Sequence, residues 1–295
     1  MQCKQPILEV KNLKQYFKLD KKTVIKAVDD VSFKIYAGEF LGLVGESGSG
    51  KSTLGRTVMH MYRPTEGEIY YRGQCISDLK IYRKERKTIQ KKIQFIFQDS
   101  TSSLNSRMTV GEIIAEPLAI YRMSCGKKER RAKVCELMNL VGLSLSFIDR
   151  HPYELSGGQR QRIAIARALA LEPDILIADE PIASLDVSIQ AQIVNLLKRL
   201  QSDKGLTCLF IAHDLAMVKY ISNRIAVMNK GKIVELADSQ ELYSNPLHPY
   251  TKALLSSIPI PDPIYAKKRE RIVYKQDKLG RGRWFEIMQN HFVLN

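Results

Sequence analysis

Apolar and polar residues alternate with a period of two in the stretch that leads up to residue 40. Val31, Phe33 and Ile35 fall on one side of an extended chain, and more polar residues stand between them. Since successive side chains of a strand point to opposite faces, this alternation predicts a β-strand with one buried and one solvated face.

Four short apolar runs follow, and each leads into polar residues or glycine. They read FLGLVG, IQFIFQ, DILIADE and TCLFIAH, at residues 40–45, 93–98, 174–180 and 207–213. Each run is too short for a helix and too apolar for a strand with one solvated face, which is typical of parallel strands buried on both faces. Because parallel strands bring their carboxyl ends to one rim of a sheet, we expect the chemistry there.

Helical patterns and one hairpin complete the order of elements. Residues 109–171, between the second and third apolar runs, are rich in helix-forming sequence. After the fourth run, RIAVMNKGKIVELAD predicts a hairpin that turns at Asn229 to Gly231. Parallel strands that alternate with helices predict an α/β fold.

The composition fits a globular protein in a reducing compartment. The 295 residues are 44% hydrophobic and 26% charged, which allows one large or two smaller domains. No stretch approaches the roughly 18 apolar residues that span a bilayer, so another chain would have to hold this one at a membrane. A disulfide framework and a zinc site are both disfavoured, because the five cysteines are scattered and form no CxxC pair: Cys3, Cys75, Cys125, Cys135 and Cys208.

The net charge of +15 suits an anionic partner such as a nucleotide, a nucleic acid or the cytoplasmic face of a membrane. Two basic runs contribute to it, at residues 80–92 and 267–275. Neither run has aromatic residues spaced for base stacking, so a solvated surface is favoured and we expect no nucleic-acid partner. Contact with lipid headgroups or with a membrane partner is the alternative.

A phosphate-binding loop follows the first apolar run directly. GESGSGKST matches the pattern G-x-x-x-x-G-K-[ST], and its strand-before, helix-after context disfavours a chance glycine-rich turn. The glycines let backbone N–H groups approach phosphate oxygens, Lys51 is expected to reach the β- and γ-phosphates, and the Ser52 hydroxyl to join the Mg²⁺ shell. The predicted nucleotide site comprises Gly45, Glu46, Ser47, Gly48, Ser49, Gly50, Lys51, Ser52 and Thr53.

Two adjacent carboxylates follow the third apolar run. Asp179 is placed to hold Mg²⁺, and Glu180 could polarise a water for in-line attack on the γ-phosphorus. The alternative, that they cap the next helix, is weakened by the phosphate loop. Gln98 and His213 close the second and fourth runs. Gln98 could reach the metal and the attacking water, and His213 could reach the γ-phosphate. The alternative for each residue taken singly is a satisfied polar residue at a strand edge, but parallel strands bring their carboxyl ends together on one rim of the sheet.

In this order, the motifs resemble those of ABC-type ATP-binding subunits over about residues 8–263. The segment LSGGQ at residues 155–159 is specific to that family among phosphate-loop proteins. The resemblance implies a P-loop NTPase (RecA-like) core with an antiparallel β subdomain and an inserted helical subdomain at about residues 100–171. It also implies an ATP-binding domain at 1–258 and a C-terminal extension at 259–295.

In that family two subunits form a head-to-tail dimer around two ATP molecules. The resemblance implies that residues of LSGGQ and of the later D-loop contact the ATP held by the other subunit, namely Ser156, Gly157, Gly158, Gln159 and Asp186. A helix that begins near Gly158 would present free N–H groups to that γ-phosphate. The alternative is a plain helix cap before a basic helix.

The resemblance also assigns single residues. Tyr16 matches the aromatic residue that stacks on adenine, although Phe17 could take that place, and Gln98 matches the glutamine that senses the γ-phosphate. The usual Ser-Ala order before the D-loop aspartate is reversed at Ala183 and Ser184, which could weaken a hydrogen bond across the dimer. Glu180, the expected base, and His213 are both present, so we expect the chain to hydrolyse ATP.

The segment NPLHPYTKALLSSIPIPDP at residues 245–263 predicts a turn and a short helix that begins at Pro249 and is stopped by Pro259. It resembles the C-terminal segment of oligopeptide and dipeptide importer ATPases. Ser100 and Ser106 stand where those subunits often have proline.

The last residues narrow this resemblance further. Many relatives carry a cysteine cluster there, but this chain has no cysteine after Cys208, so we expect no iron–sulfur cluster. The final residues, 283–295, fit the F-type subunit of these importers.

The resemblance implies an ATPase on the cytoplasmic side of the cell membrane, attached peripherally. Its expected partners are a second, non-identical ATPase subunit, two transmembrane permease subunits and an extracytoplasmic solute-binding protein, and its cofactors are ATP and Mg²⁺. Import of nickel, glutathione or another small solute by the same machinery is one alternative. A soluble ABC ATPase of translation or repair is another, although such proteins usually join two cassettes or carry long coiled coils.

Overall fold

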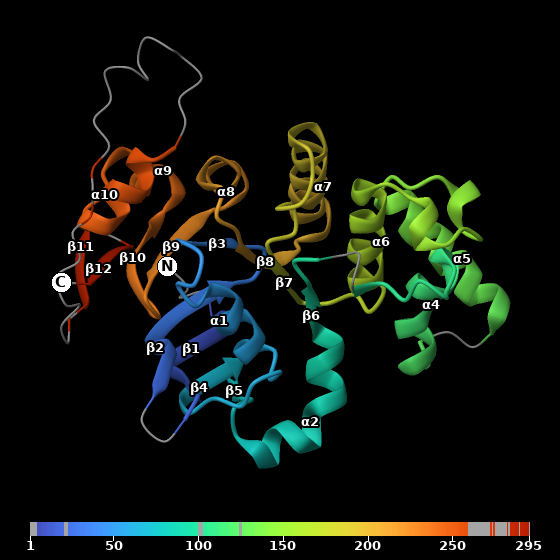
Figure 1. Ribbon diagram of the computed structural model, residues 1–295. Helices are drawn as coiled ribbons and strands as arrows, with labels where there is room; N and C mark the ends of the chain where they lie inside the picture. The colour runs from blue at the N-terminus through green and yellow to red at the C-terminus, as the bar shows by residue number, and fades with distance from the viewer. Residues whose placement is uncertain are drawn as a thin grey trace, which may run out of the picture. The chain divides into compact units, whose positions relative to one another are not determined.

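Figure 1 shows the computed structural model, in which the described residues are 5–20, 23–99, 103–123, 126–258, 272, 274, 282, 284–288 and 290–294. The chain divides into two units, one made of residues 1–77 and 210–295 and the other of residues 78–209. The division falls inside strand β8, Thr207–Ile211, whose last two residues belong to the first unit.

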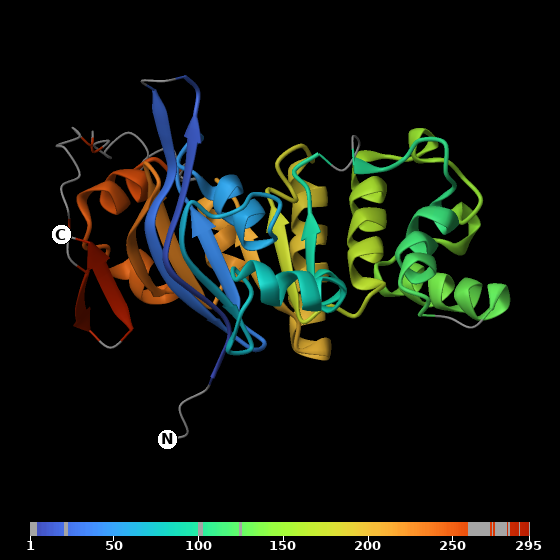
Figure 2. The ribbon, with the colours of Figure 1, turned by 90° about the horizontal axis from the view of Figure 1, so that it is seen from below.

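The first unit contains an antiparallel sheet in which β1 pairs with both β2 and β4 (Figure 2). Val31, Phe33 and Ile35 of β2 are buried while Lys34 is exposed, so the predicted half-buried strand is confirmed. In sheet order the strands are β2 (Val24–Tyr36), β1 (Pro6–Lys18), β4 (Glu66–Tyr71) and β5 (Gln74–Cys75).

A second sheet in this unit carries β3, all five residues of which are buried, as the apolar run predicts. The hairpin between β9 and β10 is also confirmed: Lys230 and Gly231 at its turn have φ angles of 44° and 83°, as a two-residue type I′ turn requires. Within the unit the order is β11 (Trp284–Met288), β12 (His291–Leu294), β10 (Lys232–Asp238), β9 (Arg224–Asn229), β3 (Phe40–Val44) and the end of β8.

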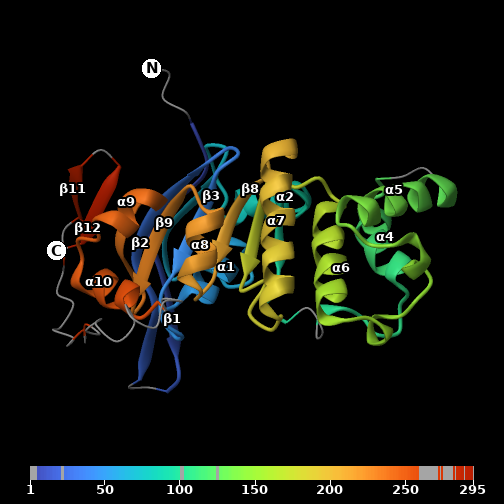
Figure 3. The same ribbon diagram turned by 90° about the horizontal axis from the view of Figure 1, so that it is seen from above.

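Helices cover these sheets. Helix α1 packs against β1 and β2, and α8 packs on β3 (Figure 3). Gly42 of β3 permits the close approach of α8, because a β-carbon there would lie 2.4 Å from Cγ1 of Val218. The described helices of this unit are α1 (Lys51–Val58), α8 (Leu215–Ile221), α9 (Ser239–Ser244) and α10 (Pro249–Ser256).

The second unit combines two parallel strands, β6 (Ile93–Ile96) and β7 (Ile175–Asp179), with a helical region. Helices α4, α5 and α6 come between β6 and β7 in the sequence and pack against one another in the structure. This confirms the predicted helix-rich interval. The described helices are α2 (Leu79–Lys92), α4 (Val110–Ile120), α5 (Lys127–Leu140), α6 (Gly157–Leu169) and α7 (Val187–Lys204), with 3₁₀ turns at Leu145–Phe147 and Pro152–Glu154.

The first basic run forms α2, a helix in which Ile89 is the one buried residue. Its charged side chains therefore lie on a solvated face, as predicted. Nearly all of the second basic run lies outside the described residues, as do Cys3, Ser100, Cys125 and Pro259. In the ranges that the structure describes, no helix combines the length and the apolar character needed to cross a bilayer.

Two strands end earlier than their apolar runs predict. Strand β6 ends at Ile96 and β8 at Ile211, so Gln98 and His213 each follow a strand by two residues instead of closing it. For β6 the physical reason is that its ladder with β7 stops opposite Ala178, two residues before the β7 backbone turns at Glu180.

The hairpin of β11 and β12 was not predicted at all. Strand β12 joins the sheet by pairing with β10, through Glu235 opposite Val293 and Leu236 opposite Phe292. This pairing fixes the described end of the chain to the strand that precedes α9 and α10.

Strand β3 sets the position of the phosphate loop, so its burial should control stability. We expect Leu43→Ala, at a side chain that is 1% exposed, to lower the free energy of unfolding by about 2–5 kcal/mol, because a cavity remains in the sheet. Chemical denaturation followed by circular dichroism measures this. Leu19→Ala, at a side chain that is 67% exposed, is the matched control and should change stability by less than about 0.5 kcal/mol. Equal effects of the two substitutions would contradict the assignment.

Candidate nucleotide site

The predicted phosphate loop connects the end of β3 at Val44 to the start of α1 at Lys51. Two of its glycines are required by the backbone. The φ angles of Gly45 and Gly50 are 154° and 105°, and a β-carbon on them would lie 2.1 Å from the Met228 carbonyl oxygen and 2.0 Å from that of Ala27. No side chain fits there, so the loop can take its path only with glycine at both positions.

Lys51 lies inside its own loop, with 4% of its surface exposed. Its ammonium group donates to the carbonyl oxygens of Gly45 and Glu46, at 2.8 and 2.9 Å. Helix α1 begins at this residue, and its N-cap, Gly50, has no side chain that could cap the first turn. A buried ammonium, a helix N-terminus and closely approachable backbone N–H groups together fit a polyphosphate.

His213 lies close to this loop in the fold of the first unit. It is exposed and follows β8, the strand next to β3, and Ala212 before it donates its N–H to the Leu43 carbonyl oxygen at 3.2 Å. Asp214 after it caps α8 through the N–H groups of Ala216 and Met217. The phosphate loop and His213 therefore follow neighbouring strands of the sheet, although His213 comes two residues after β8 and does not close it as predicted.

Tyr16 lies on β1 and is half-buried. Its hydroxyl donates to the Asp29 carboxylate, and burial together with that carboxylate raises the pKa of the Tyr16 phenol above its ordinary value. The Lys26 ammonium lies 5.2 Å from the ring centroid, while the neighbouring Phe17 ring packs edge-on against Tyr62 at 5.3 Å. Stacking of Tyr16 on adenine stays a prediction.

In the second unit the structure brings Gln98 and Glu180 together. The Gln98 amide donates to a carboxylate oxygen of Glu180 at 2.8 Å. Asp179, the last residue of β7, is completely buried, whereas Glu180 is half-buried and has a left-handed backbone with φ 46°. A non-glycine residue in this conformation is strained by about 1–3 kcal/mol, and such strain concentrates at functional sites.

The LSGGQ segment forms the start of α6. Ser156 is the N-cap: its hydroxyl accepts from the Gln159 N–H at 3.3 Å, and the Gln159 side chain accepts from the Ser156 N–H at 2.9 Å. Within one chain, the Ser156 and Gln159 side chains therefore form a capping box. This is the plain helix cap that the alternative interpretation of the segment predicts. Gly158 is buried, and a β-carbon on it would lie 2.5 Å from Ile189 of α7.

The D-loop leads into α7. Asp186 is exposed and takes the N-cap position of α7, but its side chain makes no capping hydrogen bond. Gln190 holds the loop backbone by donating to the carbonyl oxygens of Ile182 and Leu185, at 3.2 and 2.9 Å. The role of Gln190 was not predicted from the sequence, because a glutamine in a helix does not indicate which backbone groups its side chain will contact.

Comparison with known proteins decides the family. A protein-family model described as "ABC transporter" matches residues 28–183. A second family model, described as "Oligopeptide/dipeptide transporter, C-terminal region", matches residues 234–286. The chain belongs to the ABC transporter ATP-binding family. It is therefore an ATPase that binds ATP, and the predicted P-loop NTPase fold is confirmed.

Curated relatives of this ABC ATPase match almost from end to end. The chain is 57% identical to the oligopeptide transport ATP-binding protein OppF of Bacillus subtilis, over 98% of the chain and 96% of the relative. It is 54% identical to OppF of Streptococcus mutans, over 99% and 95%, and 51% identical to the dipeptide transport ATP-binding protein DppF of Lactococcus lactis, over 98% and 94%.

Solved ABC structures share the fold. A dimeric ATP-binding cassette in a post-hydrolysis state, bound to ADP and Pi, superposes with a TM-score of 0.71 at 33% identity, over 79% of this chain and 98% of that one. A dimeric bacterial ABC transporter cassette gives the same TM-score at 34% identity, with the same coverage.

Removing the loop's ammonium tests the phosphate site. We expect Lys51→Ala to weaken ATP binding by about a hundredfold or more, because the charge-assisted bonds to the phosphates are lost. Titration with a fluorescent ATP analogue measures this. Lys128→Ala, at an exposed lysine of α5, is the control and should bind like the wild type. Wild-type affinity in Lys51→Ala would refute the role of the loop.

Removing the carboxylate at the end of β7 separates binding from turnover. We expect Glu180→Gln to keep ATP binding but to lower the hydrolysis rate by about 10²–10⁴-fold, because the amide cannot accept a proton from water. Phosphate release and sedimentation report turnover and a trapped closed dimer. Glu136→Gln, at an exposed glutamate of α5, is the control. Undiminished hydrolysis in Glu180→Gln would assign the base elsewhere.

Proposed function

We propose that this ABC ATPase drives the uptake of oligopeptides or dipeptides through partner permease subunits. The observation that carries the proposal is the match of residues 234–286 to the C-terminal region of oligopeptide and dipeptide transporters. Relatives with peptide-transport names, which align over nearly the whole chain, support the same substrate class.

The roles of the site residues belong to this proposal. The loop and Lys51 hold the ATP phosphates, and Tyr16 stacks on adenine. Ser52, Asp179 and Gln98 offer hydroxyl, carboxylate and amide oxygens, a set of hard donors that fits Mg²⁺. When bound, Mg²⁺ neutralises charge on the β- and γ-phosphates.

Hydrolysis then needs a positioned water. Glu180 accepts a proton from the water as its oxygen attacks the γ-phosphorus, and ADP leaves in line. The hydrogen bond from Gln98 orients the Glu180 carboxylate, which supports this assignment. His213 contacts the γ-phosphate from the end of the strand next to the loop strand.

We propose that the active unit is a dimer with a second, non-identical ATPase subunit. Ser156, Gly157, Gly158 and Gln159 at the start of α6, with Asp186, contact the ATP that the other subunit holds. The N-terminal end of a 13-residue helix and the exposed Asp186 carboxylate, which does not cap its own helix, support this arrangement.

ATP closes this dimer and hydrolysis resets it, which moves two docked permease subunits and makes transport directional. The chain attaches peripherally to the cytoplasmic side of the membrane through those subunits, and an extracytoplasmic solute-binding protein supplies the peptide. The domain boundaries that accompany this proposal are an ATP-binding domain at 1–258 and an extension at 259–295.

Purification of the assembled transporter tests the proposal. We expect the tagged chain, solubilised from its host membrane, to retain one different ATPase subunit, two permeases and a solute-binding protein. In proteoliposomes this complex should take up a labelled oligopeptide only with ATP, and the complex with Glu180→Gln should not. Uptake of nickel or glutathione without peptide uptake would contradict the peptide assignment.

A further inference from the structure

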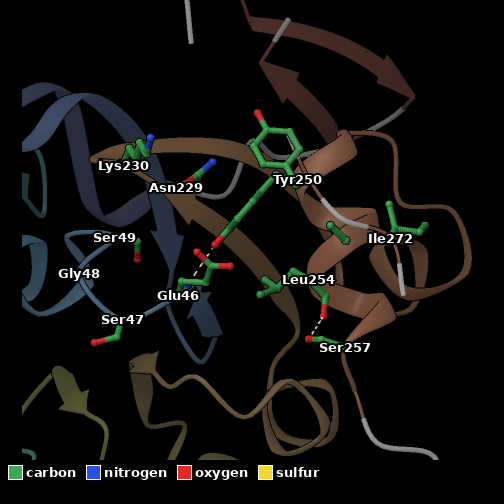
Figure 4. Close-up of a pocket in the computed structure, with 12 residues that line it drawn as sticks. Glu46, Ser47, Gly48, Ser49, Asn229, Lys230, Tyr250, Leu254, Ser257 and Ile272 are labelled. Atoms are coloured by element: carbon green, nitrogen blue, oxygen red, sulfur yellow. Dashed lines mark hydrogen bonds between the residues drawn. The ribbon is translucent and has the colours of Figure 1, made fainter. Parts of the chain in front are cut away.

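The phosphate loop is hydrogen-bonded to the C-terminal segment of the chain. The backbone N–H of Glu46 donates to the hydroxyl oxygen of Tyr250 at 3.0 Å, and Figure 4 shows the Tyr250 side chain pointing from α10 to the loop. Tyr250 is 3% exposed, and burial raises the pKa of its phenol. The phenol oxygen has lone pairs that accept the bond.

This bond acts on the same peptide group that holds Lys51. The Gly45 carbonyl and the Glu46 N–H belong to one planar peptide unit. The carbonyl accepts from the Lys51 ammonium at 2.8 Å, and the N–H donates to Tyr250 at 3.0 Å. Rotation of this peptide plane would break both bonds, so the Tyr250 hydroxyl fixes the carbonyl that holds the ammonium.

Packing alone does not hold the loop on this side. A cavity of about 530 Å³ adjoins it, lined in part by Ser47, Gly48, Tyr250 and Leu254. Glycine at Gly45 adds conformational freedom, which must be lost when the loop is ordered. A specific hydrogen bond at the edge of the cavity supplies the restraint that close-packed side chains supply elsewhere.

The position of Tyr250 is itself set by a buried carboxylate. Glu235 of β10 is completely buried and accepts from the N–H groups of Leu247 and His248, at 2.8 and 3.0 Å. The ring nitrogen Nε2 of His291, in β12, lies 2.8 Å from the same carboxylate. A buried carboxylate is tolerated only with such partners, so this cluster fixes the turn before α10.

His248 connects the cluster to Tyr250. It is the N-cap of α10, and its Nδ1 accepts from the Tyr250 N–H at 3.1 Å. The Tyr274 ring packs edge-on against the Tyr250 ring, with centroids 5.5 Å apart. The backbone and the ring of Tyr250 are therefore both held.

We propose that Tyr250 is a positioning residue for Lys51: it holds the Gly45–Glu46 peptide group so that the loop is ready for the phosphates of ATP. Glu235 of β10, with its partners in the turn before α10 and in β12, holds Tyr250 in place. The proposal rests on the proposed role of Lys51 in phosphate binding and is independent of the transported substrate.

Deleting one hydroxyl tests it. We expect Tyr250→Phe to weaken Mg²⁺–ATP binding by about two- to tenfold, the effect of one lost hydrogen bond. Titration of the purified full-length chain with a fluorescent ATP analogue measures this, and competition with inorganic triphosphate should weaken by the same factor. In the assembled complex the KM for ATP should rise while the rate at saturating ATP stays within about twofold.

Tyr274→Phe is the matched control, because it deletes a hydroxyl from the adjoining ring and keeps the ring contact. The ATP affinity of Tyr274→Phe should equal that of the wild type, and cooperative thermal unfolding should show that both variants are folded. Wild-type affinity in Tyr250→Phe, or an equal loss in both variants, would overturn the proposal. Absence of peptide uptake would overturn only the proposed substrate. Wild-type ATP affinity in Lys51→Ala would overturn the proposed phosphate site itself.

A double variant tests the connection to the buried carboxylate. Glu235→Gln leaves the turn one acceptor short, so we expect ATP affinity to fall in the same direction as in Tyr250→Phe. If both substitutions act through the Gly45–Glu46 peptide group, their effects should not add. The double variant Glu235→Gln/Tyr250→Phe should then have the same ATP affinity as the single variant that binds ATP more weakly. Losses that multiply would show that the cluster does not act through Tyr250.

Discussion

The site depends on how closely backbone can approach backbone around the phosphate loop. At Gly45 and Gly50 the loop passes so near the Met228 and Ala27 carbonyls that a single added carbon would overlap them. Within this loop the Lys51 ammonium turns inward and donates to the carbonyl oxygens of Gly45 and Glu46. The loop follows strand β3, every residue of which is buried in the sheet.

Features specified by nearby residues could be predicted from the sequence. Short apolar runs predict the buried strands, and adjacent residues that adopt positive φ angles mark the β9–β10 turn. The phosphate loop is recognised by its glycines and lysine between a strand and a helix. The α6 capping box is equally local, because Ser156 and Gln159 are three residues apart. In each case the physical cause lies within a few residues of its effect.

Long-range contacts could not be predicted in this way. Glu46 and Tyr250 are 204 residues apart, and Glu235 and His291 are 56 apart. Nothing in the periodicity or composition near Tyr250 indicates that its hydroxyl accepts from the loop. The early end of β6 was missed for a related reason, because this strand stops where the backbone of its neighbour β7 turns away and not where its apolar run ends.

Glu180 places two demands on one position. Its left-handed backbone is a conformation that glycine or asparagine adopts with less strain, so the fold by itself would favour replacing the glutamate. The role that we propose for Glu180, accepting a proton from water, requires a carboxylate there and so opposes that replacement. With Glu180 in this proposed role, selection for thermostability alone would replace the residue and inactivate the chain, so screens for stabilised variants of this ATPase should hold Glu180 fixed.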